Sequence, residues 1–276
     1  MYSFGPLPKF KQSGRIIGAH QKIDRLARRH FEQLAGKTSD FPSIREILYF
    51  EGMRGPDGVK LKSPGVDEPW HFIDLNNLSD TRLMDHINDH RGSLITAIKQ
   101  KNREKMAFEA AWLAHAVTDG LTPAHQVPYD DIMNELRGAA DALAKSVRSK
   151  VLMPGHGSVK TFVKNNWEYW GFGGVMTSHT LFEGGVATTI GPMRFNPQMF
   201  SNEDIYALVK RPFNEVIMEA IYAVAELDMY NEFHKSGWST KLARQTRREL
   251  MPIIVRTVTY AWYSALAEAE QSNGTY

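Results

Sequence analysis

MAFEAAWLAHAVTDGLTPAH, residues 106–125, is the stretch of this chain that best indicates its fold and its chemistry. Its alanines favour a helix, and Pro123 breaks that helix near its end. His115 and Asp119 are four positions apart and therefore share one helix face, and His125 follows just after the break. Buried imidazole and carboxylate groups need partners, because an unpaired buried polar group costs free energy. The stretch therefore fits either a metal site at one end of a helix or a hydrogen-bonded His–Asp pair.

Composition excludes several classes of protein and of site. The chain has 276 residues, 42% of them hydrophobic, which is enough for a sizeable core. It has no cysteine, so any metal ligands must be His, Asp, Glu or backbone oxygen. Its net charge of +2 is not the strongly basic balance of a protein that grips a nucleic-acid backbone over a wide surface.

The start of the chain and its apolar runs bear on location. No apolar run reaches membrane-spanning length, and residues 1–15 lack the apolar core of a secretory signal. Two alternatives remain, a cytoplasmic protein and a protein whose leader was removed. Met1 favours the first, so we expect a cytoplasmic protein without a transmembrane segment.

Hydrophobic periodicity predicts an all-α fold. Apolar residues recur at helical spacing, and no run of alternating β-branched residues indicates a strand. We predict a single-domain multi-helix bundle over residues 15–276, after an irregular N-terminal arm over residues 1–14. The predicted helices cover residues 15–35, 43–50, 79–101, 103–120 and 129–150, a segment at 175–183 that ends at Gly184 and Gly185, and two long helices between 202 and 270 that separate near Gly237. The stretches 51–70 and 186–200 are predicted loops.

Other histidines and acidic residues add candidate ligands. His179 and Glu183 are four positions apart on one helical face. Asp57 stands in a long predicted loop, a feature that is often functional, although Pro-Asp-Gly is also ordinary turn chemistry. His86 and His90 share a spacing of four but lie in an almost wholly polar segment, so we expect a solvated face there. The full candidate set is His20, Asp57, His71, His115, Asp119, His125, His179 and Glu183.

The string His115-x3-Asp119-x3-Pro123-x-His125 resembles the central motif of the zinc-dependent phospholipase C and single-strand nuclease family. Other elements of the family pattern occur in the same order. They are Gly18-Ala19-His20 on an early helix, Asp57 ahead of His71, and the later pair His179 and Glu183. The resemblance spans about residues 15–185 and implies a helical bundle with a cluster of three zinc ions in a cleft.

The resemblance also implies a role for each candidate ligand. Asp57, His71, His115 and Asp119 would hold one zinc ion, His125, His179 and Glu183 a second, and His20 with a bridging Asp119 a third. Asp57 would also be the proton acceptor. In the family an N-terminal tryptophan completes the third site, whereas the first tryptophan here is Trp70. We therefore expect two zinc ions, and a third site that lacks this ligand.

These expectations lead to a zinc-dependent phosphoric ester hydrolase that attacks a phosphodiester with metal-activated water. Near-neutral charge favours a small phosphoester or phospholipid substrate, as for phospholipase C, over nucleic acid. The alternatives are a single-strand nuclease or nucleotidase of the same family, a non-catalytic helical protein stabilised by metal, and a site for iron or manganese. Six aromatic residues are predicted either to pack in the core or to line an acyl or base pocket: Tyr49, Phe50, Trp70, Phe72, Trp167 and Trp170.

Overall fold

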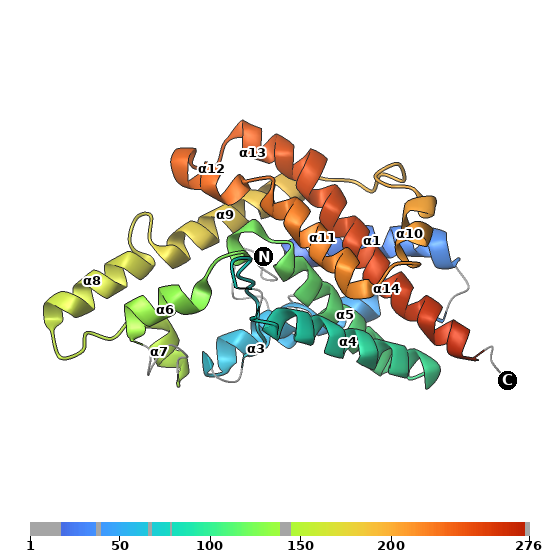
Figure 1. Cartoon of the computed structure of the whole chain (residues 1–276), viewed down its shortest axis with the longest axis horizontal. Coiled ribbons are helices and arrows are strands. Elements are labelled where there is room, and N and C mark those ends of the chain that lie inside the picture. Colours follow the sequence, from blue (N-terminus) through green and yellow to red (C-terminus); the bar gives the residue numbers. More distant parts are fainter. Residues whose placement is uncertain (1–17, 37–39, 66–67, 78, 139–144, 274–276) are drawn as a thin grey trace.

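The computed structural model describes residues 18–36, 40–65, 68–77, 79–138 and 145–273 (Figure 1). Every regular element in these ranges is a helix, so the predicted all-α multi-helix fold is confirmed. The irregular arm predicted for residues 1–14 lies outside the described residues. None of the described helices has both the length and the hydropathy needed to cross a membrane.

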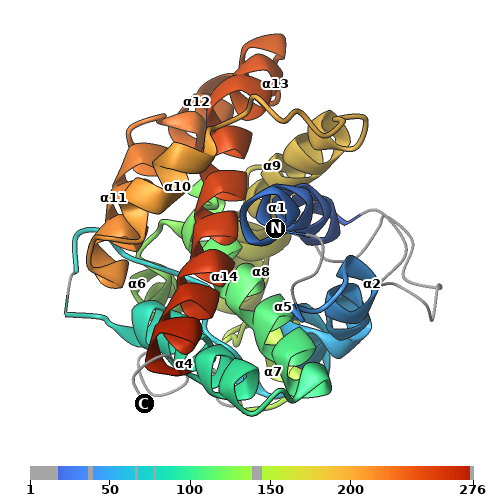
Figure 2. The same cartoon turned by 90° about the vertical axis from the view of Figure 1, so that its right-hand side faces the viewer.

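The main bundle surrounds α5 (Arg103–Gly120), the helix with the bounds that the sequence predicts. α5 packs against α1 (Ala19–Ala35), α4 (Arg82–Lys99) and α14 (Met251–Asn273) (Figure 2). It is buried on nearly every side because its many alanines allow neighbouring helices to approach closely. The indole of Trp262 on α14 is fully buried and donates a hydrogen bond to the carbonyl of Ala110 at 2.8 Å.

The remaining elements are mostly short helices. They are α2 (Ile44–Ile47), η2 (Leu48–Phe50), η3 (Gly52–Arg54), α3 (Pro56–Lys62), η5 (Pro123–His125), α6 (Tyr129–Arg137), α7 (Val147–Val151), α8 (Val159–Trp170), α9 (Val175–Ile190), α10 (Asn202–Leu208), α11 (Phe213–Ala225), α12 (Met229–Ser236), α13 (Thr240–Gln245) and the π-helical turn η7 (Thr246–Leu250). α4 begins three residues later than the Ser79 start that the sequence predicts.

The predicted loop over residues 51–70 is wrong in part, because it contains η3 and α3. Pro56 occupies the first turn of α3, where its missing N–H is not needed. α3 folds back closely on η3, and only glycine fits at the contact. A Cβ at Gly58 would lie 2.4 Å from the backbone of Met53. This close approach places Asp57 in the first turn of a helix rather than in a loop.

The prediction that Gly184 and Gly185 end a helix is also wrong, because both lie inside α9. A Cβ at Gly185 would lie 2.1 Å from the indole ring of Trp238. The glycine therefore makes room for an aromatic side chain and does not break the helix. The first residues of the predicted loop over 186–200 consequently form the last turn of α9.

Two predicted long helices are divided in the structure. The helix predicted over 129–150 stops as α6 at Arg137, because Gly138 takes a φ of 81°, and α7 follows after a gap in the described residues. Two helices are predicted between 202 and 270, but the structure has five there, α10 to α14. The predicted break at Gly237 is confirmed. The π-helical turn η7 precedes Pro252 and adapts the backbone to a residue that cannot donate a helical hydrogen bond.

A second, smaller hydrophobic cluster lies apart from the main core. It consists of Met133, Leu136, Met153 and Tyr169, from α6, α8 and the connection between α7 and α8. α8 packs against α6 and α9 and extends away from the main bundle (Figure 1). We call α6, α7 and α8, with their described connections, the α6–α8 arm.

His30 on α1 predicts a pH dependence of stability. The side chain is 1% exposed, lies 4.7 and 4.1 Å from the rings of Phe195 and Phe200, and has no hydrogen bond to a described residue. Burial lowers the pKa of His30 from 6.5 to about 4. A lowered folded-state pKa gives a stabilisation that is complete above the unfolded pKa and lost as the pH falls toward the folded pKa. We expect His30 to remove about 3 kcal/mol from the free energy of unfolding as the pH falls through this range.

Urea denaturation of the wild type and of His30→Leu at pH 7 and pH 4 measures this effect. The leucine variant should lose less stability on acidification than the wild type. An equal loss in both proteins would show that His30 does not contribute.

Candidate metal centre

Five helical elements and one non-helical segment supply the predicted ligands. The structure brings all eight together: His20 from α1, Asp57 from α3, His71 from the segment before α4, His115 and Asp119 from α5, His125 from η5, and His179 and Glu183 from α9. The break after α5 has a direct role. It turns the chain into η5, so that His125 points back toward Asp119.

Asp119 lies at the centre of the cluster. Its Oδ2 is 2.5 Å from Nδ1 of His71 and 3.4 Å from Nε2 of His115. Its Oδ1 is 3.2 Å from Nδ1 of His125 and 3.6 Å from Nε2 of His20. The two oxygens of one buried carboxylate therefore face two separate pairs of histidines, which is the arrangement expected of a bridging ligand.

The first candidate ligand group, the Asp57 group, consists of Asp57, His71 and His115. One possible ligand atom from each residue lies within 4.8 Å of the others. Nε2 of His115 is 3.7 Å from Oδ1 of Asp57 and also faces Asp119. They are three of the four residues that the family resemblance assigns to one zinc ion, and the fourth is Asp119.

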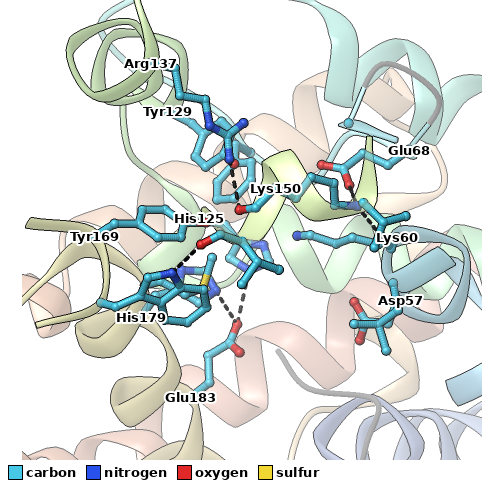
Figure 3. Close-up of a pocket in the computed structure, with 17 residues that line it drawn as sticks. Asp57, Lys60, Glu68, His125, Tyr129, Arg137, Lys150, Tyr169, His179 and Glu183 are labelled. Atoms are coloured by element: carbon cyan, nitrogen blue, oxygen red, sulfur yellow. Dashed lines mark hydrogen bonds and ion pairs between the residues drawn. The ribbon is translucent and has the colours of Figure 1, made fainter. Parts of the chain in front are cut away.

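The second candidate group, the Glu183 group, consists of His125, His179 and Glu183. Oε1 of Glu183 lies 3.1 Å from Nε2 of His125 and 3.0 Å from Nε2 of His179 (Figure 3). The two imidazole rings stack with centroids 4.9 Å apart. The spacing of four between His179 and Glu183 therefore has the geometric result that the sequence predicts, because both side chains project from one face of α9.

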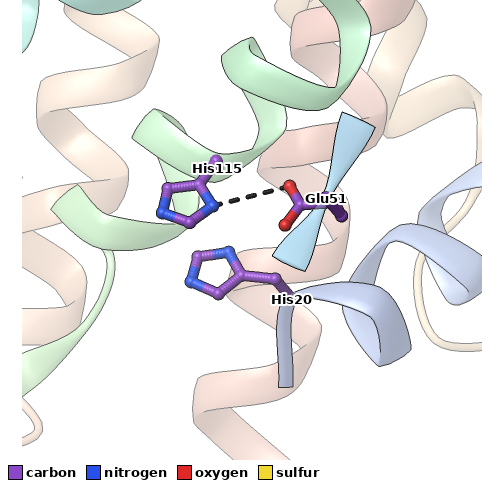
Figure 4. A group of neighbouring side chains, drawn as sticks. All are labelled: His20, Glu51 and His115. Carbon is purple, nitrogen blue, oxygen red and sulfur yellow. Dashed lines mark ion pairs between the residues drawn. The ribbon is translucent and has the colours of Figure 1, made fainter. Parts of the chain in front are cut away.

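A third group contains a residue that the sequence does not single out, Glu51. It joins His20 and His115 (Figure 4). Oε1 of Glu51 lies 3.5 Å from Nδ1 of His115, and the rings of His20 and His115 stack at 3.9 Å with 6° between their planes. The only sequence signal for Glu51 is its place at the start of the glycine-rich stretch before Asp57, and other acidic residues share such positions.

Unsatisfied nitrogen atoms test whether this cluster suits a metal. Several buried ring nitrogens make no hydrogen bond within the described part of the chain: both of His20, both of His115, Nε2 of His71 and Nδ1 of His125. Four of them lie 3.2 to 3.6 Å from carboxylate oxygens without forming a hydrogen bond. Such buried atoms are costly unless something binds them. Imidazole nitrogen with carboxylate oxygen, and no sulfur, is a donor set that fits zinc and also manganese or iron.

The charges of the cluster also favour a cation. Burial lowers the pKa of His115, but Asp119, Glu51 and Asp57 together raise it to about 9. Burial raises the pKa of Asp119, but His115 and His125 bring it well below its ordinary value. The same competition, with His115 acting against burial, lowers the pKa of Asp57. Without a metal, a protonated His115 therefore compensates buried carboxylates. A divalent cation would supply that compensation and release the proton.

A cavity gives access to part of this cluster. Asp57 and the whole Glu183 group line it (Figure 3), whereas Asp119 and His20 lie deeper. Lys60 lines the same cavity. Burial lowers its pKa, but Glu68 and Asp57 raise it above the ordinary value, so its ammonium group stays charged. A ligand in the cavity can therefore reach the Asp57 carboxylate, the Glu183 group and the ammonium group of Lys60.

The six aromatic candidates divide between the two predicted roles and the surface. Phe72 and Trp170 line the cavity. Phe50 and Trp70 pack against the main core. Tyr49 and Trp167 are exposed, so neither prediction holds for these two residues.

His86 and His90 lie in none of the candidate ligand groups of the described residues. The predicted solvated face is wrong for them, because both rings are half-buried and lie beside Trp112. Nδ1 of His90 is 2.5 Å from Oε2 of the buried Glu109. This pair is the hydrogen-bonded His–carboxylate arrangement that the sequence leaves open for His115 and Asp119.

Glu51 leads to a prediction about metal affinity. Nε2 of both His20 and His115 faces Asp119, and Glu51 lies beside both rings (Figure 4). A carboxylate that accepts the other ring N–H fixes the tautomer of a ligating histidine. We therefore expect Glu51→Gln to lower zinc affinity about 10- to 100-fold.

Competition with a chelating dye measures that affinity. Glu109→Gln is the matched control, because it removes a buried carboxylate of a histidine outside the cluster. Equal affinities in wild type and Glu51→Gln would contradict an orienting role for Glu51.

Comparison of the chain with protein-family models, with curated proteins and with solved structures finds no match.

Proposed function

We propose that this protein is a zinc-dependent phosphoester hydrolase that cleaves a phosphodiester in the manner of phospholipase C. The observation that carries the proposal is the pair of candidate ligand groups joined through Asp119, one of which opens on a cavity. Bound zinc supplies an activated water and neutralises charge on phosphate oxygens. The chain's own residues must then position the substrate and accept a proton.

Asp57 is the candidate proton acceptor. It lines the cavity, and an aspartate side chain is ordinarily ionised at neutral pH. An ionised carboxylate beside the attacking water accepts the proton that the water loses. His115 lies 3.7 Å from Asp57 and holds the carboxylate toward the cluster.

Lys60 is the candidate binding group for the phosphate. Its side chain extends into the cavity between Asp57 and the Glu183 group (Figure 3). A fixed cation there stabilises the negative charge of a phosphodiester and the charge that develops during attack. The phenyl ring of Phe72, 5.3 Å from Nζ, limits the directions in which Lys60 can move.

The walls of the cavity favour a phospholipid over a nucleic acid. Aliphatic and aromatic side chains form much of the lining, among them Leu61, Val147, Val151, Tyr169 and Met176. The chain's net charge of +2 gives little general attraction for an extended polyanion. We therefore favour a substrate with a phosphodiester head group and apolar chains.

Metal content and turnover, measured on the same samples, test the proposal. We expect two or three zinc ions per chain by plasma mass spectrometry, fewer in His115→Ala, and the wild-type content in the control His234→Ala, whose histidine is exposed. A phosphatidylcholine analogue should be hydrolysed faster than single-stranded DNA. Absence of bound metal after zinc is added back, or turnover of neither substrate by the loaded protein, would overturn the proposal.

A further inference from the structure

α8 turns its apolar face toward solvent. Val159, Phe162, Val163, Trp167 and Trp170 recur at helical spacing along the helix, and all five are exposed. The exposed fraction of the side chain reaches 81% for Val159 and 66% for Trp167. A surface helix of a globular protein normally packs such an apolar stripe against the core, whereas α8 exposes it to solvent.

The other face of α8 holds the helix in place. Asn165 is buried and donates hydrogen bonds to the carbonyls of Leu136 and Pro154 at 2.9 and 3.0 Å. Tyr169 is buried in the small cluster of the α6–α8 arm. On the outward face, Trp170 is fixed too, because its indole donates a hydrogen bond to the carbonyl of Val151 at 2.6 Å. These contacts hold α8 with its apolar face toward solvent, so the helix is not loosely attached.

The apolar surface extends beyond α8 in both directions. Phe172, just after the helix, is 94% exposed, and Val151 and Leu152 at the end of α7 are exposed too. Val147, Val151 and Trp170 are exposed and also line the cavity. The patch is thus continuous with the rim of the cavity that leads to Asp57 and the Glu183 group. We call it the outward face of α7–α8.

Charged residues beside this face indicate what covers it. Arg148, Lys160 and Lys164 are exposed on α7 and α8, and Glu168 is the one exposed acid on these two helices. Tryptophan and phenylalanine flanked by basic residues suit the interface of a bilayer, where the rings enter the head-group layer and the cations meet anionic lipid. Contact with a second copy of the chain would bring the same basic residues toward one another.

We propose that the outward face of α7–α8 binds the surface of a bilayer that contains anionic phospholipid. Trp167 and Phe172 enter the head-group layer, and Lys160 lies beside the lipid phosphates. Because the face continues into the cavity rim, docking turns the cavity toward the lipid. The binding itself does not require the proposed hydrolase activity, but the use of this geometry for substrate entry rests on it.

Co-sedimentation with vesicles of phosphatidylcholine and phosphatidylglycerol tests the docking. We expect the double variant Trp167→Ser with Phe172→Ser to bind these vesicles about tenfold or more weakly than wild type, because it loses two large interfacial side chains. Lys160→Glu should weaken binding to the mixed vesicles and have little effect on vesicles of phosphatidylcholine alone. The matched control is Tyr206→Ser with Tyr222→Ser, two aromatic residues that are exposed elsewhere, and it should bind as wild type does.

Three outcomes would overturn the docking proposal. They are equal binding by the Trp167/Phe172 variant and wild type, equal loss in the tyrosine control, and a wild-type dimer in light scattering that the variant converts to monomer. Tryptophan emission should shift to shorter wavelength with vesicles in the wild type, and the shift should be smaller in Trp167→Phe.

Separate measurements test membrane docking and the proposed hydrolase activity. Vesicle binding is measured on the protein as purified and is scored as sedimented protein, which does not depend on turnover. Turnover is measured on a water-soluble short-chain phosphodiester, where no bilayer is present. Loss of vesicle binding with unchanged soluble turnover in the Trp167/Phe172 variant supports docking. Vesicle binding by a protein that hydrolyses neither substrate refutes the proposed function alone.

Discussion

Asp119→Asn is expected to release metal from both candidate ligand groups and to reduce hydrolysis to background. The two carboxylate oxygens of Asp119 face four histidines at 2.5 to 3.6 Å, and these histidines include members of both the Asp57 group and the Glu183 group. An amide presents one oxygen and two N–H groups, so half of it would repel a cation. Loss of a ligand should lower zinc affinity by more than the roughly 10- to 100-fold that loss of a supporting residue causes.

The same substitution should also destabilise the metal-free protein. Asp119 is the strongest of the carboxylates that raise the pKa of the buried His115 to about 9. Breaking a buried ion pair at one partner costs about 3–5 kcal/mol, because the other charge stays buried and uncompensated. Urea denaturation in the presence of chelator measures this loss. Unchanged metal-free stability, with metal content equal to that of wild type, would contradict the central role of Asp119.

Glu109→Gln is a matched control for Asp119→Asn. Glu109 is also a buried carboxylate on α5, and it interacts with His90 and Lys105 outside the centre. The Glu109→Gln variant should be less stable than wild type but should keep the wild-type metal content and turnover. This control separates damage to α5 from damage to the metal centre.

Asp57→Asn is expected to lower turnover by about 10²- to 10⁴-fold, the range of contributions from a positioned proton acceptor. The amide has nearly the size of the carboxylate, so the first turn of α3 should keep its fold. Turnover and zinc content are compared on one preparation, with Asp131→Asn, an exposed residue of α6, as the control. Turnover equal to wild type would remove Asp57 from the reaction.

Zinc content decides how a rate loss in Asp57→Asn is interpreted. If zinc per chain falls by about one, Asp57 acts as a ligand, because that site would then keep only His71, His115 and the shared Asp119. If the zinc content per chain stays constant while turnover falls, Asp57 acts as the proton acceptor. The Glu183 group should keep its metal in either case.

The helices were predictable where one local signal sufficed. α5 has the predicted bounds because the side chain of Asn102 caps its start by accepting from the amide of Lys105, and because Gly120 is its last residue and Pro123 follows. The pairs His115 with Asp119 and His179 with Glu183 follow from spacing alone, because residues four apart share a helix face wherever the helix lies.

The errors arise where tertiary contacts decide the local structure. Gly185 predicts the end of a helix, but α9 continues through it. Its close contact with Trp238, far along the chain, explains why a glycine is needed there. Glu51 joins the centre because η2 and η3 bring it to His115 across the fold, which no local pattern contains. Periodicity on α8 indicates an apolar face but gives no information about the direction in which that face points.

The chain origins of the candidate ligands have a mechanical consequence. His20 and Glu183 come from α1 and α9, and Asp119 lies between them in the sequence and in space. A metal cluster on these residues would cross-link distant segments of the chain and close long loops, as disulfides do in secreted proteins. The chain has no cysteine, so its tolerance of heat and proteases should respond to chelators and be indifferent to reducing agents.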